Sequence, residues 1–272
     1  MRIASAGHAV FAATLIAFGV LSLINVNGGF SVIWAPVPKG LPARQVLYLC
    51  AGISLISGLG LLWQRTAAPA ARLLFAYLFG LIVLRLTELA RSLAVDVYWG
   101  AAKTAVMLAA AWVLFVWFAT DWDYRRLGLA TGDKGLRIAR TFYGLAMIFF
   151  GVAHFQYVEH TASLVPGWLP AHVAWAYFTG SAFIAAGLAI VFGVFARLAA
   201  ALSSLQMGLF LLLVWVPKVA AGSISAFNWG ETIVSWALAV AGWVVADSYR
   251  GTPWFAVVQG KGRELRPTVG TA

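Results

Sequence analysis

Residues 98–118 read YWGAAKTAVMLAAAWVLFVWF, and Lys103 is the one charged side chain in this stretch. A helix needs about 20 mostly apolar residues to cross the hydrocarbon core of a bilayer, so this stretch predicts a membrane-spanning helix. Seven other stretches meet the same criterion. The sequence therefore predicts an all-α fold, an integral membrane helical bundle of eight transmembrane helices. The predicted helices cover roughly residues 8–26, 44–63, 72–92, 98–118, 138–157, 172–194, 197–216 and 230–248.

The composition also points to a membrane environment. Of the 272 residues, 62% are hydrophobic and 10% are charged, and the mean hydropathy is +0.87. Soluble domains carry about 25% charged residues, because a folded globule needs a charged exterior. The lipid bilayer is therefore expected to be the solvent and the main partner of this chain. The formal net charge of +10 is typical of the basic loops of membrane proteins and does not indicate nucleic-acid binding.

The chain contains an approximate copy of itself, offset by roughly 130 residues. The WGA motif at 99–101 returns as WGE at 229–231, and FGV at 18–20 returns at 150–152. In so apolar a chain, a repeat of this length predicts a membrane bundle built from two similar units. With four helices per unit, both units enter the membrane from the same side, so the repeats are predicted to be parallel.

This repeat divides the chain into four predicted parts. Residues 1–119 and 137–249 are the two four-helix units. Residues 120–136 form a cytoplasmic linker between them. Residues 250–272 form a cytoplasmic tail, which we expect to be disordered.

The distribution of Lys and Arg predicts the orientation in the membrane. The side that holds both termini also holds most of the 19 Lys and Arg residues. Cytoplasmic loops are enriched in these residues, so both termini are predicted to be cytoplasmic, in the inner membrane of a bacterium. The N-terminal apolar run lacks a small-residue cleavage site, and we interpret it as the first spanning helix.

Arg85 and Glu88 are the clearest candidates for a functional site, because ionisable side chains at membrane depth are costly. The two residues are three apart and therefore neighbours on one helix face. They are compatible with a ligand- or proton-handling site. The alternatives are an ion pair that only fixes the helix rotation, and an arginine that reaches out to the membrane surface.

His154, Tyr157 and Glu231 are expected near the same outer side and complete the candidate ligand-binding set. For His154, a single hydrogen bond between helices is the structural alternative. The spacing of the histidines and carboxylates matches no metal signature, so no metal site is predicted. Four further polar residues are expected to form a cluster on the outer face: Glu159, His160, His172 and Lys218.

The sequence offers no catalytic constellation. It contains no pair of nucleophile and base, no phosphate-binding loop and no dinucleotide fingerprint in a suitable context. Cys50 is the single cysteine, which rules out an intramolecular disulfide and a CxxC redox pair. The chain is therefore predicted to be at most a non-catalytic subunit of an enzyme complex.

The second unit resembles the DoxX family. The resemblance rests on FGVAHF at 150–155, LVPGWLP at 164–170, and then Trp175, Gly180 and AGL at 186–188. The family consists of bacterial four-helix membrane proteins, some of which resemble subunits of quinone-linked oxidation systems, while others are tied to oxidative-stress complexes. The resemblance implies a membrane subunit with a redox or quinone connection.

Three functions are compatible with these observations. The leading hypothesis is a non-catalytic membrane subunit that binds a quinone, a similar lipidic molecule or an oxidoreductase partner. A transporter or channel for a small solute is the first alternative, since bundles built from repeats often carry substrates. A structural interaction scaffold, in which the polar residues only lock the helices together, is the second.

Overall fold

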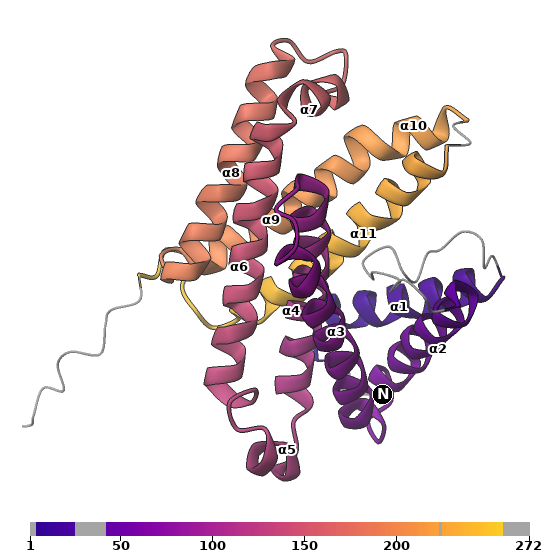
Figure 1. The fold of residues 1–272 in the computed structure, drawn as a ribbon. Helices are drawn as coiled ribbons and strands as arrows, with labels where there is room; N and C mark the ends of the chain where they lie inside the picture. Colours follow the sequence, from indigo (N-terminus) through magenta and orange to yellow (C-terminus); the bar gives the residue numbers. More distant parts are fainter. Residues whose placement is uncertain (1–3, 25–41, 223–224, 258–272) are drawn as a thin grey trace, which may run out of the picture.

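The computed structural model describes residues 4–24, 42–222 and 225–257, and its long elements are helices (Figure 1). Eight helices are long and apolar enough to cross a membrane, which confirms the predicted all-α membrane bundle. The last two residues of the first predicted helix, 25–26, and residues 258–272 of the predicted tail lie outside the described residues. The helices are α1 (Ala6–Ile24), α2 (Ala43–Leu61), α3 (Ala67–Leu89), α4 (Val95–Phe118), α5 (Asp121–Arg126), α6 (Gly132–Gln156), α7 (Val158–Leu164), α8 (His172–Phe192), α9 (Ala196–Phe210), the π-helical η3 (Leu211–Trp215), α10 (Val216–Ala220) and α11 (Ala226–Asp247).

Helix α6 begins at Gly132 rather than near 138, and two further differences from the predicted helix boundaries involve prolines. Helix α3 begins at Ala67 rather than near 72, because Pro69 falls in its first turn, where a helix needs no backbone donor. The seventh span continues to Ala220 although Pro217 lies within it. The π-helical turn η3 directly precedes this proline and accommodates the interrupted hydrogen-bond ladder.

Consecutive spans run in opposite directions between two ends of the bundle. Helices α1, α3, α6 and α9 begin at the end that carries α5, which we call the linker end. Helices α2, α4, α8 and α11 finish there. We call the opposite end, where α7 and α10 lie, the distal end (Figure 1).

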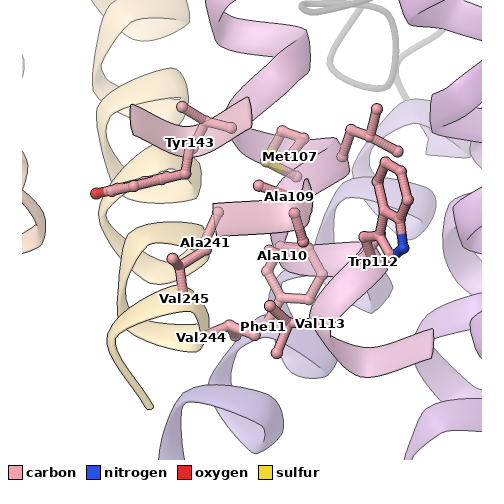
Figure 2. Close-up of a cluster of buried hydrophobic side chains, with 14 of the residues drawn as sticks. Phe11, Met107, Ala109, Ala110, Trp112, Val113, Tyr143, Ala241, Val244 and Val245 are labelled. Atoms are coloured by element: carbon pink, nitrogen blue, oxygen red, sulfur yellow. The ribbon is translucent and has the colours of Figure 1, made fainter. Parts of the chain in front are cut away.

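Helix α4 lies at the centre of the bundle and packs against α3, α6 and α11. Its residues from Val106 to Phe115 are all buried, and all are apolar. A helix that is apolar on every side lies either in a protein core or across a membrane, and α4 is a span that other helices also surround. Figure 2 shows the result: Phe11 of α1 and Tyr143 of α6 meet α4 together with residues of α11, among them Ala241, Val244 and Val245.

Glycines allow α6 and α8 to approach closely. A Cβ atom added to Gly151 would lie 2.5 Å from the Gly180 carbonyl oxygen, and one on Gly187 would lie 2.5 Å from the Gly144 carbonyl oxygen. Real Cβ atoms do not tolerate such distances, so a larger residue must push the helices apart. In membranes, small residues at helix interfaces permit this tight packing.

The pair α1 and α2 is packed by the same means. A Cβ atom on Gly19 would lie 2.9 Å from the Ala51 carbonyl oxygen, and one on Gly58 would lie 2.7 Å from the Ala12 carbonyl oxygen. The first two spans of each predicted unit therefore share one packing device. The division into two parallel repeats itself stays a prediction.

The predicted linker is held to the bundle by Asp123, which is buried in α5. Its carboxylate accepts hydrogen bonds from Arg72 of α3 at 2.5 and 2.9 Å, and from the backbone N–H and hydroxyl of Thr120 at 2.7 Å each. Burial disfavours the ionised carboxyl, but these donors outweigh burial and hold the pKa of Asp123 below its ordinary value. The indole of Trp112 donates to the carbonyl of Ala130 at 2.8 Å and fixes the end of the linker.

The first and last spans meet, because α1 packs beside α11. The backbone N–H of Gly7 donates to the Asp247 carboxylate at 3.2 Å, and the Trp236 indole donates to the Thr14 hydroxyl at 2.9 Å. The bundle is thereby closed into a ring of contacting helices.

The chain after α11 folds back over the start of α9. The backbone N–H of Phe195 donates to the carbonyl of Ala256 at 2.8 Å, and Val194 forms an isolated β-bridge with Val257. The first residues of the predicted tail, 250–257, thus contact the linker end of the bundle.

We expect Gly151→Ala to lower the stability of the bundle by about 2 kcal/mol, because the added methyl group overpacks the contact between α6 and α8. The measurement is the thermal unfolding temperature in detergent. Gly208→Ala is the matched control, since nothing lies within 4 Å of a Cβ atom at that position. The control is expected to be neutral or stabilising. Equal effects of both substitutions would contradict the proposed packing.

Candidate functional site

The first turns of α4 form a polar and aromatic surface at the distal end, which we call the α4 platform. It consists of Tyr98, Trp99, Gly100 and Lys103. Three neighbouring helices contact it with side chains that the sequence singled out. The contacting side chains are Arg85 on α3, His154 and Tyr157 at the end of α6, and Glu231 on α11.

Arg85 and Glu88 form an ion pair, with 2.9 Å between Nη1 and Oε2. The Arg85 side chain is 15% exposed and that of Glu88 38%, so the arginine lies inward and the glutamate toward the surface. The guanidinium lies against Gly100, where an added Cβ atom would be 3.2 Å from its central carbon. Arg85 Nε is buried without a hydrogen-bond partner among the described residues. The pair therefore lies within α3 and orients the guanidinium against Gly100 of α4, with the buried Nε–H left without a partner among the described residues.

His154 is enclosed by aromatic rings. Its ring centroid lies 5.4 Å from that of Phe183, 5.8 Å from that of Phe210 and 6.4 Å from that of Trp99. Its Nδ1 lies 2.7 Å from the Phe150 carbonyl oxygen, which can only accept a hydrogen bond. Nδ1 must therefore carry the proton. In the neutral ring, Nε2 is then a hydrogen-bond acceptor within an apolar enclosure.

Tyr157 ends α6 and faces the same indole, with 6.5 Å between its ring centroid and that of Trp99. One residue earlier, Gln156 accepts a hydrogen bond from the Tyr98 hydroxyl. The end of α6 is thereby attached to the platform by two consecutive side chains. Tyr157 is 43% exposed, so its ring also forms part of the surface beside Trp99.

Glu231 of α11 pairs with Lys103 across the helix interface, with 3.0 Å between Oε1 and Nζ. Both side chains are largely covered, at 21% and 16% exposure. Lys103 Nζ also lies 5.6 Å from the ring centroid of Trp99, a cation–π geometry. The indole of Trp99 is therefore shared by a histidine, a tyrosine and a lysine.

Sequence reasoning did not assign Trp99 and Lys103 to the site. In the sequence, Trp99 stands out only as part of the repeated WGA motif, and Lys103 only as the one charged residue of the 98–118 stretch. The repeated motif offered a signal, since Glu231 occupies in the WGE copy the position of Ala101 in the WGA copy. A carboxylate gained at an interhelical position requires a cation nearby, and Lys103 is that cation.

The four residues of the predicted outer-face cluster lie on three elements at the distal end, α7, α8 and α10. Glu159 and His160 are exposed on α7, and His172 begins α8. Lys218 lies on α10, where its Nζ is 5.1 Å from the ring centroid of Trp215. Within residues 4–24, 42–222 and 225–257, no three His, Cys, Asp or Glu side chains come together in a way that could hold a metal ion.

Eight spanning helices with polar side chains gathered at one end define a multi-pass membrane protein. The family model of DoxX matches residues 135–216, which run from the first turn of α6 through η3. The match includes His154 and all the motifs on which the resemblance rests. The second half of the chain thus contains a DoxX-like region, and the predicted resemblance is confirmed. No curated protein and no solved structure matches the chain.

We expect the ion pair between Lys103 and Glu231 to stabilise the contact of α4 with α11. Lys103→Met and Glu231→Gln should each destabilise the bundle, because each leaves one covered charge without its partner. The double variant should lose less than the sum of the single losses, with a coupling of about 1 kcal/mol. Thermal unfolding of the four proteins in detergent measures this coupling. Strictly additive losses would mean that the pair contributes nothing.

Proposed function

We propose that this chain is a non-catalytic membrane subunit that binds a quinone or a similar lipidic molecule at the α4 platform. The observation that carries the proposal is the state of His154. Its Nε2 is an acceptor, and the ring is enclosed by the aromatic side chains of Trp99, Phe183 and Phe210. The DoxX-like region supports the same proposal, since the family resemblance implies a quinone or redox connection.

The chemistry of the platform suits a quinone headgroup. A quinone ring is flat and stacks on aromatic faces such as those of Trp99 and Tyr157. A quinol hydroxyl can donate to His154 Nε2, and a quinone carbonyl can accept from the Lys103 ammonium. The apolar tail of the molecule would extend into the bilayer beside the helices. An oxidoreductase partner would supply the electron transfer, and this chain would position its lipidic substrate.

The apolar middle of α4 argues for a binding subunit over a transporter. Between the platform and Asp123, α4 is buried from Val106 to Phe115 among apolar side chains. A solute crossing beside this helix would meet no polar lining there. The polar ends of the described bundle are therefore separated by a packed core.

A structural scaffold is the second candidate, and one observation favours it. The charged side chains at the platform are paired within the chain, Arg85 with Glu88 and Lys103 with Glu231. The second pair locks α4 to α11 without any ligand, and the first fixes the arginine within α3. The two candidates differ in whether His154 contacts a bound molecule.

We also propose that the protein lies in the inner membrane of a bacterium, with the linker end in the cytoplasm. Among the described residues, nine Lys and Arg lie toward the linker end and five toward the distal end. The nine are Arg65, Arg72, Arg125, Arg126, Lys134, Arg137, Arg140, Arg197 and Arg250, and the five are Arg44, Arg85, Arg91, Lys103 and Lys218. This asymmetry is the one that orients multi-pass proteins.

We expect decylubiquinone, used as the probe, to raise the thermal unfolding temperature of the detergent-solubilised protein by a few degrees at saturation. His154→Phe should remove most of this shift, because phenylalanine keeps the ring and loses the Nε2 acceptor. His160→Phe is the matched control, since His160 is exposed on α7, and it should respond like the wild type. A wild type that does not respond, or an equal response of His154→Phe, would favour the scaffold.

The orientation can be tested by labelling in intact cells. In a Cys50→Ser background, we expect His160→Cys to react with a membrane-impermeant maleimide and Leu129→Cys to stay unlabelled until the cells are permeabilised. Both positions are exposed, Leu129 at 75%, so accessibility does not limit the reaction. The reverse pattern would place the linker end outside.

A further inference from the structure

A second site lies at the linker end, far along the helices from the α4 platform. A cavity of about 470 Å³ opens there between the start of α9, the end of α11 and the chain that folds back after α11. We call it the Arg197 pocket. It is lined by Arg197, Ala201, Ser204, Leu205, Trp243, Ala246, Asp247, Arg250 and Trp254.

Arg197 is held in place at the pocket by two contacts with the returning chain. Its Nη1 donates to the carbonyl oxygen of Thr252 at 2.7 Å, and its guanidinium carbon lies 4.0 Å from the ring centroid of Trp254. A guanidinium carries five N–H donors, and this arrangement fixes its plane while using one of them in the bond to Thr252. Arg197 is thus prepared to bind an anion.

Arg250 adds a second positive charge. Its Nη2 lies 3.1 Å from an Asp247 carboxylate oxygen, and its side chain is 56% exposed. The other Asp247 carboxylate oxygen accepts the backbone N–H of Gly7 at 3.2 Å. The one acidic side chain of the lining is therefore already satisfied by protein donors. Two arginines against one aspartate leave a net positive lining.

The pocket opens onto an apolar surface of α9. Leu202, Leu205 and Leu209 are 53%, 56% and 42% exposed, and their spacing of three and four residues places them on one helix face. Leu205 also lines the pocket itself. Trp243 of α11, which is 42% exposed, forms the other side, as indoles do at the level of lipid headgroups. A molecule with an anionic head and apolar chains fits both parts of this surface.

We propose that the Arg197 pocket binds the phosphate group of an anionic phospholipid, whose acyl chains lie along the exposed leucines of α9. The arginines provide charge-assisted hydrogen bonds to the phosphate oxygens. Basic pockets between spanning helices at the cytoplasmic side are suited to such headgroups. A free phosphate anion shares the headgroup chemistry and lacks the chains, so the leucine face favours the lipid as the source.

The test is native mass spectrometry of the full-length protein in detergent, titrated with phosphatidylglycerol and with phosphatidylcholine. The wild type should retain phosphatidylglycerol in preference to phosphatidylcholine. In the double variant Arg197→Gln/Arg250→Gln, this preference should fall about tenfold, because two charge-assisted contacts are removed. Arg250→Gln alone leaves the contacts of Arg197 with Thr252 and Trp254 in place, and should lose about threefold.

Arg137→Gln is the matched control, because it removes one exposed positive charge from the same end of the bundle at α6. It should leave the preference unchanged. If Arg137→Gln and Arg250→Gln lose the same amount of preference for phosphatidylglycerol, general surface charge explains the binding. The proposed lipid site in the Arg197 pocket is then wrong. Competition by inorganic phosphate distinguishes a phospholipid headgroup from a free phosphate anion as the ligand of the pocket. If phosphate at the lipid concentration displaces phosphatidylglycerol, the leucine face contributes nothing and the lipid proposal is wrong.

Discussion

The complete burial of α4 is the constraint on which the rest of this structure depends. Alanine, valine, leucine and aromatic residues cover every side of this helix. Lipid and neighbouring helices are equally apolar surroundings for it, so the hydrophobic effect does not favour one over the other. Its position is therefore fixed by packing and by polar contacts at its two ends. At the distal end these contacts come from Glu231 of α11 and Gln156 of α6, and at the linker end from the indole of Trp112, which bonds the carbonyl of Ala130.

This arrangement explains why the polar side chains of so apolar a chain gather at the ends of its central helix. A charged group within a bilayer needs a partner in the protein, and α4 packs against α3, α6 and α11, which can supply one. Lys103 is the clearest example, since one ammonium group serves both the Glu231 carboxylate and the Trp99 ring. The candidate site and the stability of the bundle thus depend on the same few contacts, and the proposed ligand would use groups that are already positioned by them.

Much of the fold could be predicted from the sequence, because spanning helices are encoded locally. Each needs only a long apolar run, and the stretch at 98–118 predicts α4 to within three residues at its start. The ion pair of Arg85 with Glu88 was equally accessible, since both residues lie on one helix at a spacing of three. Short elements were missed where the signal is weak, as with the single turn of π-helix before Pro217.

The contacts between helices could not be predicted in the same way. Nothing in the local pattern states that Lys103 meets Glu231, or that Trp99 stacks beside His154, because those residues are separated by long stretches of chain and meet only in the packed bundle. The pocket around Arg197 depends on the chain folding back after α11, which composition suggested would be disordered. Tertiary contacts decided each of these features.

The seam between α1 and α11 has a consequence for the connectivity of the protein. Because the described chain begins and ends at the same pole of a closed ring, the order in which the helices follow one another is not dictated by their packing. A circular permutant that joins the start of α1 to the chain after α11, and is opened in the exposed turn near Leu129, would keep every neighbouring pair of helices in contact. The packing of the described bundle is circular, and it does not depend on which helix comes first in the chain.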